Sequence, residues 1–171
     1  FALGTDTGGS VRLPAACCGV VGIKPTHALV PRHGFVDLVP WTDTIGPLAR
    51  DVETAAAVVE TMAGHDIRDP ASSHVEIGSL TDGLGEPGCS GLTVRRVRPP
   101  TGAADDGVAD PILETADQLA AEHEVTVEEI AVDLSGISRA YPLLVGGFSW
   151  LIRQRGIIRR GGTSYQMEWR T

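Results

Sequence analysis

The segment of this chain with the clearest potential for chemistry is a glycine-rich stretch close to its start, which reads D-T-G-G-S-V-R from Asp6 to Arg12. A short apolar run precedes it, and a strand that stops at a turn exposing one hydroxyl is how many hydrolases present a nucleophile. Ser10 supplies that hydroxyl, which becomes reactive only when a neighbouring base removes its proton. The turn is also compatible with a plain chain reversal or with a nest of N–H groups that binds phosphate. A Walker A loop is excluded, because no G-K-[ST] follows.

The stretch closely resembles the amidase signature family, whose members hydrolyse carboxamide C–N bonds with a Ser–Ser–Lys triad. The matching segments are Asp6 to Ala15, Cys18 to Gly22, Lys24 to Thr26 and Asp43 to Arg50. The resemblance implies that Ser10 is the nucleophile that becomes acylated. It also implies that a neutral lysine activates Ser10 through a second serine, which is held by a cis peptide bond.

In the family, that lysine and that second serine lie well upstream of the glycine-rich block, and the 171 residues contain neither motif. We therefore expect the chain to be an internal piece of a longer enzyme that does not hydrolyse amides by itself. We also expect the piece alone to be weakly stable, because a strand separated from its sheet neighbours exposes an unpaired edge.

The residues around Ser10 are expected to stabilise the oxyanion of a tetrahedral intermediate. The expected backbone N–H donors are those of Thr7, Gly8, Gly9 and Ser10. Glycines permit a tight turn and close approach of a substrate, and a donor aimed at the developing charge is commonly worth about 3 kcal/mol. A helix that begins at Ser10 would add its positive end. Asp6 and Arg12, at the two ends of the loop, are interpreted as structural supports, and a contact between Arg12 and an acidic substrate is the alternative.

Lys24 is the only lysine in the chain. The resemblance places it after the nucleophile, outside the triad, so a structural role is predicted, although a buried lysine can become a neutral base. Cys17 and Cys18 are predicted to pack in the core of an apolar helix rather than to act as nucleophiles. The resemblance implies no metal and no organic cofactor, and the five histidines lack metal-ligand spacing such as H-E-x-x-H.

Composition restricts the partners that the chain is expected to have. It is 42% hydrophobic and 21% charged, which is typical of a globular protein, and its net charge of −8 lacks the basic footprint of a nucleic-acid binder. The apolar runs are too short to span a bilayer. Three cysteines, an odd number, favour reduced thiols in a cytoplasmic protein.

The family resemblance implies a small-molecule amide as the partner. Composition argues against direct contact with nucleic acid or a membrane, and a homodimer is left open. The arginines at 153, 155, 159 and 160 are read as a solvated face.

The helices and strands around Ser10 are predicted from the positions of glycine and proline, which end such elements, and from the spacing of apolar residues. We predict a mixed α/β fold, a sheet flanked by helices, in which 1–64 form the nucleophile core and 92–171 a peripheral α/β part of one incomplete amidase signature domain. The expected elements are a buried strand at 1–5, a helix at 10–18 capped by Ser10, a helix at 51–63 capped by Asp51, a strand at 92–98, a helix opening at Asp110-Pro111, a strand at 125–132 and a helix at 141–158.

Three functions are therefore compatible with the sequence. The first is hydrolysis of a carboxamide through a seryl acyl-enzyme. The second is the glutamine-hydrolysing subunit of a tRNA-dependent amidotransferase, which uses the same triad. The third is a non-catalytic fragment or interaction module that keeps the fold without the chemistry.

Overall fold

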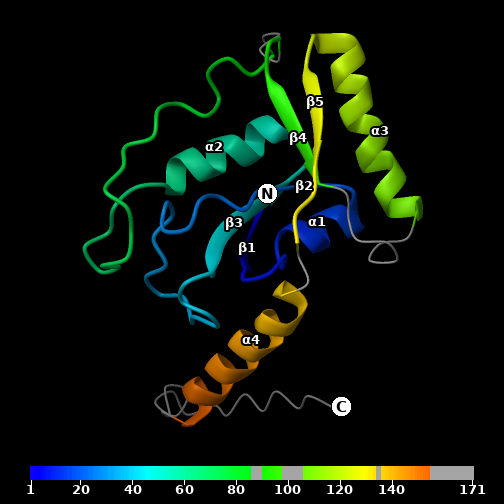
Figure 1. Ribbon diagram of the computed structural model, residues 1–171. Helices are drawn as coiled ribbons and strands as arrows, with labels where there is room; N and C mark the ends of the chain where they lie inside the picture. The colour runs from blue at the N-terminus through cyan, green and yellow to red at the C-terminus, as the bar shows by residue number, and fades with distance from the viewer. Residues whose placement is uncertain (86–89, 98–105, 134–135, 155–171) are drawn as a thin grey trace. The chain divides into compact units, whose positions relative to one another are not determined.

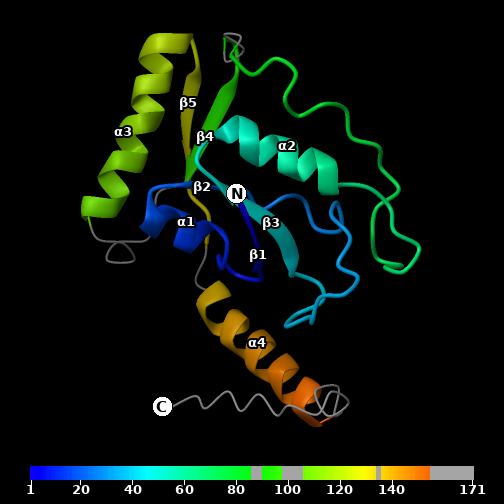
Figure 2. The same cartoon turned by 180° about the vertical axis from the view of Figure 1, so that it is seen from behind.

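A computed structural model of the chain describes residues 1–85, 90–97, 106–133 and 136–154, and Figures 1 and 2 draw it from two opposite sides. The chain divides into two compact units, one made of residues 1–84 and 141–171 and the other of residues 85–140. The first unit holds a three-stranded antiparallel sheet and the second a parallel strand pair, and helices accompany both. The predicted mixed α/β class is therefore confirmed.

The sheet of the first unit has the order β1-β3-β2, with β1 (Ala2–Asp6) and β2 (Val21–Gly22) both antiparallel to the central β3 (Thr44–Ala49). In β3, Gly46 is required because the carbonyl oxygen of Ile23 fills the place that a Cβ would take. The strand predicted at 1–5 is present, but its predicted burial is wrong. Leu3 is 54% exposed, because in the described part of the chain β1 is the edge strand of the sheet and pairs with β3 alone.

Two helices accompany this sheet. Helix α2 (Val52–Met62) begins as predicted, because the Asp51 carboxylate accepts the N–H of Thr54 at 2.6 Å and caps the helix. Its buried residues are Ala55, Ala56 and Val59, and it contacts β3, alongside which it lies in Figure 1. Helix α1 (Arg12–Cys18) contacts β2 and ends at Gly19, which adopts the left-handed conformation with φ of 64°.

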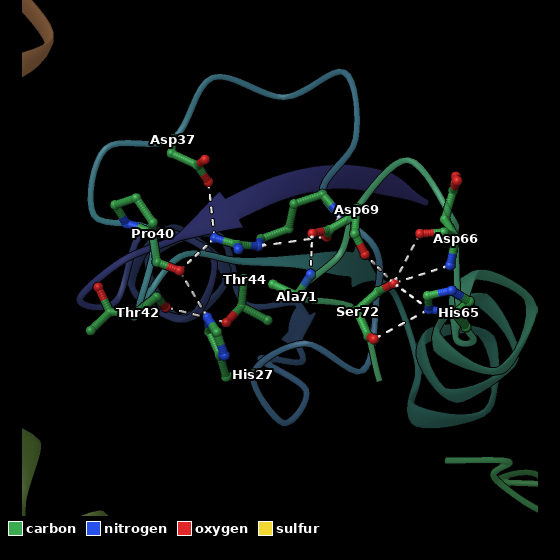
Figure 3. A network of polar contacts seen from close by, with 11 residues as sticks. His27, Asp37, Pro40, Thr42, Thr44, His65, Asp66, Asp69, Ala71 and Ser72 are labelled. Carbon is green, nitrogen blue, oxygen red and sulfur yellow. Dashed lines mark hydrogen bonds and ion pairs between the residues drawn. The ribbon is translucent and has the colours of Figure 1, made fainter. Parts of the chain in front are cut away.

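Two long loops of this unit are joined through Arg32, whose side chain is buried. Its guanidinium donates to the carboxylate of Asp37 at 2.9 Å and to the carbonyl of Pro40 at 2.6 Å, both labelled in Figure 3. Its backbone N–H donates at 2.7 Å to Asp69, which also accepts the N–H of Ala71 at 3.1 Å. The segment before β3 is thereby fastened to the segment after α2.

We predict that Asp69→Asn lowers the free energy of unfolding by about 1–2 kcal/mol, because a buried acceptor of two backbone N–H groups is replaced by a group that is partly a donor. Urea denaturation of the full-length protein measures this. The exposed Asp82→Asn should change the free energy of unfolding by less than about 0.5 kcal/mol. Equal values for the two variants would contradict the assigned role of Asp69.

The second unit contains a strand, a helix and a strand, as predicted. Strand β4 (Thr93–Val97) pairs in parallel with β5 (Thr126–Ile130), and α3 (Asp106–His123) connects and contacts both. The predicted start of this helix at Asp110-Pro111 is wrong, since α3 begins four residues earlier and Pro111 lies inside it. A proline inside a helix removes one backbone hydrogen bond, and the flanking turns of α3 form despite that loss.

A fourth helix, α4 (Ile137–Gln154), begins four residues before the predicted start, and the predicted end at Ile158 lies outside the described residues. Cys89 and the arginines at 155, 159 and 160 also lie outside them. None of the helices in the described ranges has the length and apolar character needed to cross a bilayer.

Candidate active site

Ser10 lies in the turn between the end of β1 and the start of α1, and it is exposed. The turn depends on Gly9, whose φ of 129° lies in a region that residues with a Cβ rarely adopt. The expected arrangement of a strand, a glycine turn and an exposed hydroxyl is therefore present in the fold. Within the described part of the chain, the Ser10 hydroxyl has no hydrogen-bond partner, so it is accessible to groups from elsewhere.

The glycine turn, residues 6–12, is organised by the fully buried carboxylate of Asp6. It accepts the backbone N–H of Gly9 at 2.7 Å, of Val11 at 3.2 Å and of Arg12 at 3.4 Å. It also binds the Arg12 guanidinium, with Nε at 3.0 Å and Nη2 at 3.1 Å. The middle and the far end of the turn are therefore tied to the last residue of β1, which fits the interpretation of Asp6 and Arg12 as supports.

Asp6 also replaces Ser10 as the cap of α1. The helix begins at Arg12, its N-cap position is Val11, and no side chain at that position makes a capping bond. The predicted helix start and cap at Ser10 are wrong, because the orphan N–H groups of Val11 and Arg12 are satisfied by a carboxylate that precedes the turn. The hydroxyl of Ser10 is thus left free of a capping role.

The charge of Asp6 is fixed by its neighbours. Burial by itself would raise the pKa of this carboxyl, but the Arg12 guanidinium and the backbone N–H groups of Gly9, Val11 and Arg12 outweigh burial and hold the pKa well below its usual range. The same hydrogen bond raises the pKa of Arg12. Both groups are consequently ionised at neutral pH, and the pair adds no net charge beside Ser10.

Of the four expected oxyanion donors, the structure distinguishes one from the other three. The N–H of Gly9 is already donated to Asp6 at 2.7 Å. For residues 7, 8 and 10, no backbone N–H has a protein acceptor among the described residues. Three N–H groups around the turn therefore remain candidate donors to a bound oxygen, although the ring of Tyr141 lies against Gly8, while the fourth N–H group holds the turn in shape.

Asp43 lies near the site and had no role predicted from the sequence. It is fully buried, and its Oδ1 accepts the hydroxyl of Thr7 at 2.5 Å. Its signal in the sequence is its place at the head of the second resembling block, directly before a strand. Its contact with Thr7, 36 residues earlier in the chain, is not indicated by that position.

The remaining candidates lie apart from this chemistry. Lys24 is exposed and its Nζ donates to the carbonyl of Pro25 at 3.1 Å. Cys17 and Cys18 are free thiols and exposed, so their predicted core packing is wrong. The buried residue of α1 is Ala15, whose Cβ would lie 2.6 Å from a Cβ at Gly22 of β2. The seven-residue helix therefore buries one small side chain and leaves both of its cysteines exposed.

A cavity of about 550 Å³ lies at the end of α2, lined by Pro31 and residues 62–68. It includes none of the residues of the glycine turn. Its lining includes Met62, Ile67 and three polar residues, His65, Asp66 and Arg68, and Asp66 and Arg68 pair with each other at 2.6 Å. The candidate nucleophile Ser10 and the N–H groups that have no acceptor among the described residues lie at the glycine turn and not in this cavity.

The known proteins to which this chain is similar include amidotransferase subunits and a peptide amidase. A glutamyl-tRNA(Gln) amidotransferase subunit of Salinibacter ruber is 43% identical over 135 residues, which are 77% of this chain and 25% of that protein. The peptide amidase of Stenotrophomonas maltophilia is 34% identical with a TM-score of 0.67, over 76% of this chain and 27% of that one. A glutamyl-tRNA(Gln) amidotransferase subunit of Thermotoga maritima is 31% identical with a TM-score of 0.73, over 92% of this chain and 37% of that one.

The chain spans about a fifth to a quarter of the length of the curated relatives that it matches. Residues 1–151 match the protein family described as Amidase, and this range contains the glycine turn and the Asp43 block. The resemblance first read from the D-T-G-G-S stretch is thereby confirmed over most of the sequence: the chain belongs to the Amidase family.

Proposed function

We propose that the full-length protein hydrolyses a carboxamide C–N bond through an acyl-enzyme on Ser10. The observation that carries the proposal is the glycine turn, which presents an exposed hydroxyl next to backbone N–H groups at residues 7, 8 and 10 that have no acceptor among the described residues. Oγ of Ser10 attacks the amide carbon, and the carbonyl oxygen takes the electron pair as an oxyanion. Donors already aimed at that oxygen stabilise it without reorganising during the reaction.

The tetrahedral intermediate then expels the amine or ammonia, which receives a proton, and leaves an ester on Ser10. Water hydrolyses the ester and releases the carboxylic acid. The proton acceptor for Ser10 is proposed to be the lysine of the family triad, acting through the second serine, and both belong to the part of the full-length protein outside these residues. No metal or organic cofactor takes part in the proposed reaction, and the proposed setting is the cytoplasm.

A second candidate is favoured by the 43% identity to a subunit of glutamyl-tRNA(Gln) amidotransferase. In this case the substrate is glutamine, the products at this site are glutamate and ammonia, and further subunits are needed to use the ammonia. The chemistry at Ser10 is the same in both candidates, so the glycine turn does not separate them. They differ in the substrate and in the partner proteins.

The test combines covalent trapping with a substrate panel. We expect a fluorophosphonate probe to label the full-length protein on the peptide that contains Ser10, since the probe reacts with an activated serine. Ammonia or amine release is then measured for glutamine, peptide amides, and aliphatic and aryl amides. Glutamine as the preferred substrate would identify the second candidate, and labelling of a different serine would refute the assignment of Ser10.

A further inference from the structure

Asp43 meets Thr7 because of the register of the sheet. In the antiparallel pair of β1 and β3, Asp6 lies opposite Thr44, so the next residues beyond the ends of the two strands are Thr7 and Asp43. At this position the two residues are joined by their side chains, with the Thr7 hydroxyl donating to Asp43 Oδ1 at 2.5 Å. The contact is therefore specified by the strand pairing that also sets where the glycine turn begins.

The second carboxylate oxygen of Asp43 holds another part of the chain. Oδ2 accepts the backbone N–H of Leu38 at 2.5 Å and of Val39 at 2.8 Å, and the N–H of Asp43 donates back to the carbonyl of Val39 at 2.9 Å. The carboxylate is completely buried, and each of its oxygens has a donor. A buried charged group that is fully hydrogen-bonded resists displacement, because any movement leaves polar groups unpaired.

We propose that Asp43 is a positioning residue of the active site, which holds Thr7 and thereby aims the N–H groups of Thr7 and Gly8 at the oxyanion. Asp6 fixes residues 9–12 of the turn through Gly9, Val11 and Arg12, but it accepts no N–H from residues 7 or 8. Residues 7 and 8 are held instead through the Thr7 side chain. Oxyanion stabilisation depends on donors held within a few tenths of an ångström of their place. The inference rests on the proposed amide hydrolysis.

The primary test is Asp43→Asn in the full-length protein, assayed on the best amide substrate of the panel. We expect kcat to fall about 10- to 100-fold, the scale of a small misplacement of catalytic groups. KM should change by less than about threefold, because the donors act on the oxyanion more than on the bound amide. Labelling of Ser10 by the fluorophosphonate should slow by a factor similar to that for kcat.

A pair of variants at Thr7 isolates the hydrogen bond itself. Thr7→Val keeps the shape of the side chain and removes the donor, so it should lower kcat by the same factor as Asp43→Asn. Thr7→Ser keeps the donor and should retain kcat within about threefold of the wild type. The double variant Asp43→Asn/Thr7→Val should be no slower than the slower single variant, since coupled residues are not additive.

Asp69→Asn is the matched control. Asp69 is also a buried carboxylate that accepts two backbone N–H groups, but both of these donors lie outside the glycine turn. The substitution should lower the melting temperature and leave kcat within about twofold of the wild type. A fall in kcat for Asp43→Asn could then not be explained by a loss of stability. Wild-type kcat in soluble Asp43→Asn would overturn the inference.

If Asp43→Asn does not fold, the Thr7 variants decide, because they leave the two backbone bonds of Asp43 Oδ2 intact. Equal kcat for Thr7→Val and Thr7→Ser would then overturn the inference. Undiminished activity of Ser10→Ala would instead refute the proposed function. If Ser10 is essential but the Thr7 hydroxyl is dispensable, the role of Asp43 is refuted and the proposed function is not.

Discussion

Replacing Ser10 by alanine in the full-length protein is expected to lower kcat for amide hydrolysis by at least about 10³, because the proposed acyl-enzyme has no other atom on which to form. The substitution should hardly affect folding. Ser10 is exposed, caps no helix and has no hydrogen-bond partner among the described residues, so the free energy of unfolding should change by less than about 0.5 kcal/mol. Steady-state kinetics and urea denaturation measure the two quantities on the same preparation.

The matched control for this prediction is Ser79→Ala, another exposed serine, which contacts Glu60 and Thr81 and is placed in no catalytic role. It should leave kcat within about twofold, as is usual for a surface substitution away from a site. Activity of Ser10→Ala near that of Ser79→Ala would contradict the nucleophile assignment. A variant of Ser10 that loses activity only because it unfolds would appear in the denaturation curve.

Asp6→Asn is expected to cause the largest loss of stability, about 3 kcal/mol, because the buried carboxylate is the acceptor of several hydrogen bonds and its loss leaves buried donors unpaired. The carboxylate of Asp6 is completely buried and accepts three backbone N–H groups in addition to the Arg12 guanidinium. The amide of asparagine keeps a single acceptor oxygen, so part of this set would be left unpaired. Urea denaturation of the full-length protein at about pH 7, where the carboxyl is ionised in both states, gives the value.

The same variant carries a pH signature whose sign is fixed by the lowered pKa of Asp6. A carboxyl with an ordinary pKa of about 3.9 in the unfolded chain and a lower pKa in the folded protein releases its proton more readily when folded. Its contribution to stability is therefore complete above the unfolded pKa and is lost as the pH falls toward the folded pKa. The stability difference between wild type and Asp6→Asn should be constant from about pH 5 to 7 and shrink below about pH 4.

Taking the difference between the two proteins removes the titration of other carboxyls, among them Asp66 and Asp69, whose pKa values are also lowered. Asp69→Asn, measured over the same pH range, is the control for a second buried carboxylate. A difference between wild type and Asp6→Asn that stays constant down to about pH 3 would mean that Asp6 is not held ionised by Arg12 and the backbone N–H groups.

Features governed by neighbouring residues were predicted from the sequence. The cap of α2 by Asp51 was predicted correctly, because the donor at Thr54 is three residues away and the geometry of a helix start fixes their distance. The strand, helix and strand of the second unit were predicted in the right order, because the spacing of apolar residues and the positions of glycine and proline are local signals. The family resemblance located the turn that bears Ser10.

Features that depend on distant residues were not predicted. The cap of α1 was assigned to Ser10, yet it comes from Asp6, since a carboxylate at a strand end reaches N–H groups that a local capping rule would give to the nearest hydroxyl. Cys17 and Cys18 were expected in a core because they are apolar, but burial is decided by what packs against each face of α1. The N–H of Gly9 was expected to be a free donor, whereas it is bonded to Asp6.

The sequence indicated the residue types of the candidate site: a glycine turn after a strand, the hydroxyls of Thr7 and Ser10, and an acid and an arginine at the ends of the turn. How that turn is held depends on contacts between residues that lie far apart in the sequence. The pairing of β1 with β3 brings Asp43 against Thr7 across 36 residues, and no local pattern encodes which strands pair or in what register. The residue types are local information, whereas the contacts that aim them follow from long-range pairing and burial.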